Sequence, residues 1–192
     1  MSTHSPASAG SSEPAQRPAP SQGTAAEPAP ETRSGWRLRA PDPTDAETIA
    51  RWSRSRAEAA AWVSRPEHPF PADAVRGWWQ EADVQPWLLV DPAGEPVAYG
   101  ELWDDEQEDE VELARLIVDP DRRRRGVGRR LVDELLLLAS ALGRASCFLR
   151  VASDNSAALA LYRSAGFRDV DPDQAAEWNE GQPHSYAWLT HP

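Results

Sequence analysis

Hydrophobic and polar residues follow two different periods along this chain, and each change of period predicts an element. Short apolar runs bounded by turn residues predict strands, whereas leucines three or four positions apart predict an amphipathic helix. The clearest helix carries its leucines on one face, at Leu131, Leu135, Leu138 and Leu142. Gly143 follows where a left-handed C-terminal cap is expected, so this helix is predicted to end there.

The other segments complete a mixed order of strands and helices. Strands are predicted at residues 36–39, 87–90, 97–103, 111–118, 145–151, 167–170 and 185–189. Helices are predicted after a capping box from Thr44 to Glu47, around residues 75–79 and at residues 157–165. This order predicts an α/β fold in which a mixed, mostly antiparallel central sheet has helices on both faces.

The first 35 residues differ in composition from the rest of the chain. They hold scarcely any large apolar side chain, so they cannot offset the entropy of ordering. The sequence therefore predicts a disordered tail at residues 1–35 and one domain at residues 36–192. The tail lacks the apolar segment of a secretory signal, the chain lacks an 18-residue apolar stretch, and its single cysteine, Cys147, excludes an intramolecular disulfide. These features predict a cytoplasmic protein without a membrane partner.

A run of arginines and glycines lies between a predicted strand and the leucine helix. Residues 122–130 hold six of the 20 basic residues in a chain whose formal net charge is -11. Asp119 and Pro120 end the strand, because proline cannot donate to a strand ladder. Gly126 and Gly128 let the backbone approach a phosphate, and the free N–H groups of the first helical turn bind anions. The pattern favours a polyanionic ligand at this helix start; arginines that merely neutralise nearby acidic residues are the alternative.

The sequence excludes two common phosphate-binding motifs. A P-loop requires a lysine, which this chain lacks, and a dinucleotide fingerprint requires Gly or Ala where the chain has Leu131. What remains is Arg123-x-x-Gly126-x-Gly128 after an Ile-Val-Asp-Pro strand end. This arrangement resembles the acetyl-CoA-binding motif of the GNAT superfamily of N-acetyltransferases.

A second segment resembles another signature of the same family. It begins at Asn155, has Tyr162 two helical turns later on the same side, and ends with Gly166 and Phe167. The resemblance covers about residues 36–190. It implies a GNAT-like fold whose fourth and fifth strands splay apart. It also implies an N-acetyltransferase that moves an acetyl group from acetyl-CoA to a primary amine by direct attack, without a metal.

The resemblance further implies how acetyl-CoA binds. The backbone of the fourth strand is expected to pair with the pantetheine arm, and an amide near Ile117 to hold the thioester oxygen. Amides from Arg124 to Arg129 are expected to bind the diphosphate, while Asn155 either contacts the pantetheine or serves only as a helix N-cap. The residues expected at the cofactor are Leu116, Ile117, Val118, Arg123, Arg124, Arg125, Gly126, Val127, Gly128, Arg129, Asn155 and Tyr162.

Two residues are expected to move protons. Tyr162 is expected to protonate the departing thiolate, because a tyrosine with its ordinary pKa of about 10 is still an acid at neutral pH; a core aromatic is the alternative. Glu112 is the candidate general base, with Glu101 or a water molecule as alternatives, and a solvated strand start is its structural interpretation. Cys147 lies among apolar residues and is expected in the core.

Acidic segments bear on the acceptor. Residues 104–110 are almost entirely acidic, and Asp171, Asp173, Glu177 and Glu180 follow the sixth predicted strand. Two acidic loops at one cleft would attract a cationic small molecule or a peptide amine. Hydrated turns that keep the protein soluble are the alternative.

The sequence departs from one group of the family. Enzymes of the family that acetylate ribosomal protein N-termini have an Arg-x-x-Tyr-Tyr ending, whereas this chain ends His184-Ser-Tyr186-Ala-Trp188, and Arg150 replaces a frequent glutamate. That substrate is therefore not carried over. Two other classes stay open: a non-catalytic acyl-CoA-binding sensor, and a protein whose arginine run docks nucleic acid or an acidic protein. The acidic surroundings of the run argue against a nucleic acid partner; monomer and homodimer are both open.

Overall fold

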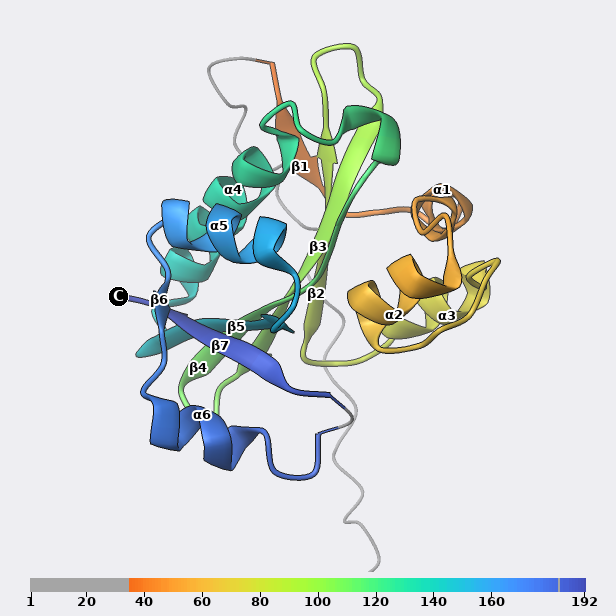
Figure 1. Cartoon of the computed structure of the whole chain (residues 1–192). Coiled ribbons are helices and arrows are strands. Elements are labelled where there is room, and N and C mark those ends of the chain that lie inside the picture. Colours follow the sequence, from red (N-terminus) through yellow and green to blue (C-terminus); the bar gives the residue numbers. More distant parts are fainter. Residues whose placement is uncertain (1–34, 183) are drawn as a thin grey trace, which may run out of the picture.

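Residues 35–182 and 184–192, which the computed structural model describes, form a seven-stranded sheet with the strand order β1-β2-β3-β4-β5-β7-β6 (Figure 1). Neighbouring strands are antiparallel except β4 and β5, which are parallel. The strands are β1 (Arg37–Arg39), β2 (Val84–Val90), β3 (Pro96–Asp105), β4 (Glu110–Val118), β5 (Ser146–Ala152), β6 (Arg168–Asp169) and β7 (Tyr186–His191). The mixed, mostly antiparallel sheet that the sequence predicts is confirmed. Residues 1–34 of the predicted tail lie outside the described part of the chain.

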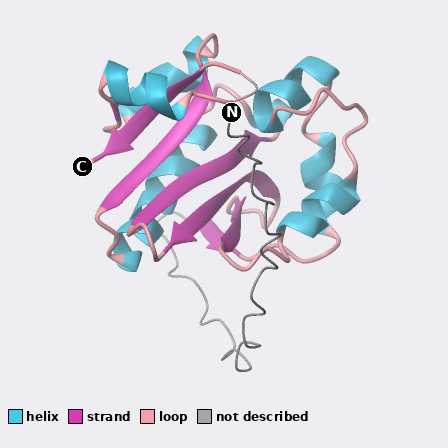
Figure 2. Ribbon diagram, turned by 90° about the horizontal axis from the view of Figure 1, so that it is seen from below, coloured by secondary structure: helices cyan, strands magenta, loops and turns pink. Residues whose placement is uncertain are grey.

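Helices cover both faces of this sheet (Figure 2). One face carries α1 (Asp45–Arg51), α2 (Arg56–Val63) and α3 (Ala72–Trp78). The other face carries α4 (Val127–Leu142) and α5 (Ser156–Ser164). Helix α6 (Pro172–Trp178) packs its last residue against Phe148 and Trp188 of the sheet. The predicted α/β fold class is therefore confirmed.

Three local predictions were incomplete or wrong. Helix α2 is not predicted because its alanine-rich sequence lacks an apolar stripe; Ala59 is its fully buried residue. Helix α6 occupies part of the segment expected to be an acidic loop, and the Asp171 carboxylate accepts a 3.0 Å hydrogen bond from the Asp173 amide at its start. The capping box is wrong, because the Thr44 hydroxyl donates to Asp42 and does not cap α1.

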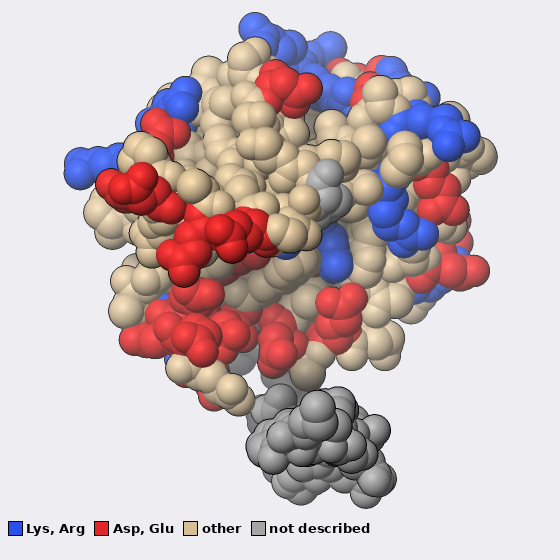
Figure 3. Space-filling model, turned by 60° about the horizontal axis from the view of Figure 1, so that its bottom comes forward, with Lys and Arg blue, Asp and Glu red and all other residues tan. Residues whose placement is uncertain are grey.

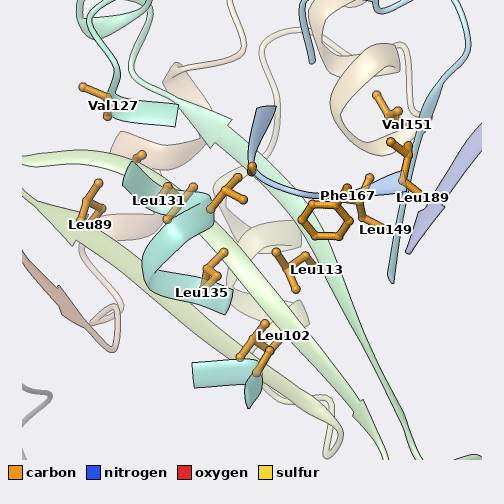
Figure 4. Close-up of a cluster of buried hydrophobic side chains, with 14 of the residues drawn as sticks. Leu89, Leu102, Leu113, Val127, Leu131, Leu135, Leu149, Val151, Phe167 and Leu189 are labelled. Carbon is orange, nitrogen blue, oxygen red and sulfur yellow. The ribbon is translucent and has the colours of Figure 1, made fainter. Parts of the chain in front are cut away.

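Helix α4 joins the sheet through the leucine face that the sequence identifies (Figure 4). Leu131 and Leu135 are fully buried against Leu102 of β3 and Leu113 of β4. This packing fixes the orientation of α4 relative to the loop that precedes it. The start of α4 is thereby held at the end of β4.

Replacing Leu135 with alanine is expected to lower the free energy of unfolding by about 2–5 kcal/mol, because a cavity remains in a closely packed core. Leu137→Ala, two residues further along α4 and on its opposite side, is the matched control, since Leu137 is 68% exposed. Urea unfolding followed by circular dichroism measures both changes. Equal effects of the two substitutions would contradict this packing.

Strands β4 and β5 pair at only one end. Glu110–Glu112 pair with Ser146–Phe148, and beyond these residues the two strands separate, so the predicted splay is confirmed. On its other side, β4 carries one extra residue against β3, since Tyr99 opposes Ile117 while Glu101 opposes Ala114. Such a bulge bends the strand and redirects its backbone groups. The redirected part of β4 faces the opening between β4 and β5.

Candidate active site

The loop before α4 exposes a row of backbone amides. Arg124 and Gly126 both have left-handed backbone conformations, with φ values of 61° and 79°. The first helical hydrogen bond runs from the Arg130 amide to the Gly126 carbonyl, at 3.0 Å. Within the described residues, no amide from Arg124 to Arg129 donates to a backbone carbonyl. Successive free amides at a helix start form a concavity that binds anions.

The arginine side chains of this loop divide into two kinds. Arg123 ties the loop to the first helices: it pairs with Glu58 at 3.1 Å and donates to the carbonyls of Trp52 and Val118. Arg124 and Arg125 are exposed, and neither forms an ion pair with another described residue. These two arginines are the cations that an anion in the loop can recruit.

Arg129 and Gly128 fix the first turn of α4 against α5. Arg129 pairs with Asp133 at 2.7 Å and donates to the Ser164 carbonyl at 2.8 Å. A Cβ on Gly128 would lie 3.0 Å from the Leu161 side chain and 3.5 Å from that of Val118. Gly128 therefore permits the close approach of α4, α5 and the end of β4.

Asn155 is the N-cap residue of α5, and Tyr162 lies in the last turn of that helix. The Asn155 side chain accepts a 3.2 Å hydrogen bond from the Ala158 amide, which confirms its N-cap interpretation. The Tyr162 ring packs edge-on against Phe167, with 6.0 Å between ring centroids. Burial raises the pKa of Tyr162 to about 12, so its hydroxyl stays protonated throughout the neutral range. Cofactor contacts of both residues stay predictions.

Glu112 lies on β4 next to the point where β4 and β5 separate. Its side chain is 12% exposed, and Oε1 lies 3.2 Å from Nε of Arg150 on β5. Burial raises the pKa of Glu112 to about 7, against the opposing effect of the Arg150 charge. Among the described residues, the ion pair with Arg150 engages one of the two oxygens of this carboxylate. A carboxylate with a pKa near neutrality and a free oxygen is suited to accept a proton.

Glu101, the alternative base, is differently placed. It is fully buried, and its carboxylate accepts hydrogen bonds from the Tyr99 hydroxyl, from the Trp103 indole at 2.6 Å and from Arg115 at 2.9 Å. Burial raises the pKa of Glu101 as well. Because three donors occupy its oxygens, Glu101 organises Arg115, whose guanidinium carbon lies 4.2 Å from the Trp78 ring centroid. This arrangement favours Glu112 over Glu101 as the base.

A pocket of about 300 Å³ opens in front of Glu112. It is lined by Glu81, Asp83, Val84, Trp103, Asp104, Asp105, Glu110, Glu112 and Phe148. A second pocket, of about 450 Å³, shares Asp83, Asp104 and Asp105 with the first. Acidic side chains gather broadly on the surface that faces forward in Figure 3.

The lining corrects the sequence interpretation in two respects. Only the first acidic segment, at residues 104–110, contributes to these pockets; none of the acidic residues at positions 171–180 lines either one. Glu81 and Asp83, which precede β2, also line the pocket, although they belong to neither predicted acidic segment. Their position just before β2 could have predicted this, because the antiparallel pairing of β2 and β3 brings the start of β2 opposite Asp104.

Other chemistry has little support in the described part of the chain. Cys147 is partly buried, and burial raises the pKa of its thiol to about 11, so it is a poor nucleophile at neutral pH. Residues 35–182 and 184–192 hold no group of three or more His, Cys, Asp or Glu side chains arranged to bind a metal ion. The helices of these residues are too short or too polar to cross a bilayer.

Comparison with known proteins identifies the family. Residues 47–167 match the model of the acetyltransferase (GNAT) family, which is more than half of the chain. The chain therefore belongs to the GNAT acetyltransferase family, a class of acyltransferases.

Particular relatives differ in what they acetylate. A mycothiol acetyltransferase of Clavibacter michiganensis subsp. michiganensis is 36% identical over 111 residues, which cover 55% of this chain and 36% of that protein. The ribosomal protein bS18-alanine N-acetyltransferase of Escherichia coli strain K12 is 43% identical over 62 residues, which cover 32% of this chain and 42% of that enzyme. The chain thus spans less than half the length of these curated relatives.

A solved structure shares the fold. The spermidine N-acetyltransferase of Vibrio cholerae, solved in complex with CoA and spermine, has a TM-score of 0.64 and 18% sequence identity. The match covers 82% of this chain and 94% of that chain. At this level of sequence identity the likeness concerns the fold.

Proposed function

We propose that this chain transfers an acetyl group from acetyl-CoA directly to a primary amine. The observation that carries the proposal is the row of free amides from Arg124 to Arg129, which follows the end of β4, beyond the point where β4 and β5 separate. Family membership supports the same activity. The free amides fit a diphosphate, and the opening between the strands fits an extended pantetheine arm.

The proposed cofactor contacts use mainly backbone groups. Amides from Arg124 to Arg129, including those of Gly126, Val127 and Gly128, bind the diphosphate, and the side chains of Arg124 and Arg125 add charge. The backbone of Leu116, Ile117 and Val118 on β4 pairs with the pantetheine arm. Arg123 acts by holding the loop in place, because its guanidinium is already engaged by Glu58. Bound in this way, acetyl-CoA supplies a thioester carbonyl that an amine can attack.

The proposed proton transfers use Glu112 and Tyr162. Glu112 takes one proton from the incoming ammonium and later releases it to solvent, and the resulting neutral amine attacks the thioester carbonyl to form the new C–N bond. The nitrogen loses its second proton to solvent as the C–S bond breaks. Tyr162 donates its phenolic proton to the departing sulfur and regains one from solvent. The amide near Ile117 stabilises charge on the thioester oxygen. These transfers require Glu112 to be ionised and Tyr162 to be neutral. Both states coexist between the pKa of Glu112, about 7, and that of Tyr162, about 12.

We further propose that the acceptor is a cationic amine that enters through the acidic pocket. The pocket leads to Glu112, and no arginine lines it. Burial raises the pKa of Glu110, and the negative charges of Asp105 and Glu108 raise it further. A bound cation relieves this repulsion. The acceptor is thereby drawn toward the proposed base.

Calorimetric titration with acetyl-CoA, followed by an amine panel monitored for thiol release, tests the proposed activity. We expect acetyl-CoA binding and turnover with di- and polyamines, with neutral amines much less active. Turnover confined to neutral or acidic amines would contradict the cationic acceptor. Tight acetyl-CoA binding without turnover of any amine would instead establish the acyl-CoA-binding sensor.

The double variant Asp83→Asn with Asp105→Asn is expected to raise KM for a polyamine about 5- to 30-fold without lowering kcat. Two exposed carboxylates contribute about 1–2 kcal/mol in total to binding a cation, and salt weakens that contribution. Steady-state kinetics at two ionic strengths measures the effect. Asp173→Asn on α6, outside both pockets, is the matched control, and an equal KM increase there would argue against the pocket.

A further inference from the structure

Arg150 is held beside the proposed base by contacts from three strands. It lies on β5 opposite Trp188 of β7, and its Nε is 3.2 Å from Oε1 of Glu112 on β4. Its guanidinium carbon lies 5.5 Å from the Trp188 ring centroid, 5.6 Å from that of Tyr186 and 5.9 Å from that of Trp103. The Tyr186 hydroxyl is itself hydrogen-bonded to Ser64 after α2. The cation is therefore fixed in direction by aromatic faces.

The place of Arg150 along β5 explains why this contact matters. Phe148 is the last residue of β5 that pairs with β4, opposite Glu112. Arg150 is two residues further on and therefore points to the same side of the sheet. It stands where the strands begin to separate. Its ion pair involves one carboxylate oxygen of Glu112, and the other oxygen is left for a group in the pocket.

Both negative and positive side chains surround Glu112, and the negative ones are more numerous. On its own strand, Glu110 disfavours the ionised form of Glu112, whereas Arg115 favours it. Across the pocket stand four more carboxylates, those of Glu81, Asp83, Asp104 and Asp105. Tyr186, whose ring packs on Arg150, is the other titratable group in contact with that guanidinium. Burial and the neighbouring carboxylates raise the pKa of Glu112, and the charge of Arg150 is the largest effect that lowers it.

We propose that Arg150 is a positioning residue that keeps Glu112 ionised and aims its free oxygen into the acceptor pocket. Arg150 transfers no proton itself. Its charge also disfavours the ammonium form of an amine that approaches Glu112, which assists loss of the proton. This role rests on the proposed function of Glu112 as the base. It assigns a purpose to an arginine that neither family signature includes.

The first test compares the pH dependence of kcat/KM in variants at position 150. Arg150→Gln is expected to move the acid limb toward higher pH by about one unit or more, because loss of an adjacent opposite charge raises a carboxyl pKa. Arg150→Lys retains the charge and is expected to restore most of this shift. Arg76→Gln, which removes another ion-paired arginine far from the pocket, is the control and leaves the limb unchanged.

The second test does not require turnover. The side-chain carboxyl carbon of Glu112, assigned by its absence from Glu112→Gln, is titrated by NMR in the wild-type protein and in Arg150→Gln. A midpoint at higher pH in Arg150→Gln, reversed by Arg150→Lys, supports the positioning role, and an unchanged midpoint overturns it. If no amine is acetylated, the proposed function fails while this titration still decides the role of Arg150.

Discussion

Replacing Glu112 with glutamine lowers kcat for amine acetylation by about 100- to 10,000-fold, the range expected when a general base is removed. The amide cannot take the proton, yet it occupies nearly the same volume, so acetyl-CoA affinity stays close to that of the wild-type protein. Thiol release with a saturating amine measures kcat, and calorimetry measures the affinity. Glu177→Gln, exposed on α6 and outside both pockets, retains full activity.

The pH dependence of kcat/KM in the wild-type protein also reports on Glu112. As pH falls through about 7, Glu112 becomes protonated and kcat/KM declines. Tyr162 produces no alkaline decline near neutral pH, since burial raises its pKa to about 12 and keeps the phenol protonated there. An activity that survives Glu112→Gln, with its acid limb unmoved, would assign the proton to water or to Glu101.

Replacing Gly126 with valine weakens acetyl-CoA binding by about 5- to 150-fold. Gly126 has a φ of 79°, and a β-branched residue held in such a conformation costs about 1–3 kcal/mol. Nothing lies within 4 Å of the position of the added Cβ, so the effect arises from backbone strain and not from a clash. In the variant, part of the binding free energy of acetyl-CoA is used to return the loop to the conformation that binds the diphosphate. Calorimetric titration with acetyl-CoA measures the change in Kd.

Gly77→Ala is the matched control for this substitution. Gly77 lies within α3, has ordinary helical φ, and has open space around its Cβ position. Alanine there retains acetyl-CoA affinity and favours the helix. A similar loss of affinity in both variants would show that the loop conformation is not specific to the cofactor.

The fold was predictable where the pattern of apolar residues was strong. The leucines of α4 predict both the helix and its buried face, and the strand that precedes it ends at Val118 as predicted. Helix α2 lacks such a stripe because its apolar residues are mainly alanines. Strand β2 begins at Val84, three residues before the predicted start. The sequence pattern missed these residues because Gln85 and Pro86 interrupt the apolar run. Pairing with β3 overrides this local signal.

The candidate site was predictable in its motifs but not in its electrostatics. Two glutamates on neighbouring strands look equivalent in sequence, and only their surroundings separate them. Glu101 is saturated by donors that include Arg115, whereas Glu112 keeps a free oxygen beside Arg150. Arg150 is far from Glu112 along the chain, so their contact follows from the parallel pairing of β4 and β5. A linear pattern does not encode that relation.

The arginine run shows the same limit at a smaller scale. Its composition indicates an anion site but does not distinguish the arginines that build the loop from those free to meet a ligand. Arg123 is engaged by Glu58 of α2 and Arg129 by the Ser164 carbonyl of α5, while Arg124 and Arg125 are exposed. The division depends on where α2 and α5 lie relative to the loop.

The proposed acetyl-CoA site requires that the amides at the start of α4 bind the diphosphate, and amide NMR during titration with acetyl-CoA measures this binding. The resonances of residues 124–129 should move most and should saturate with the Kd found by calorimetry. Saturable binding that leaves these resonances in place while shifting others would contradict the account.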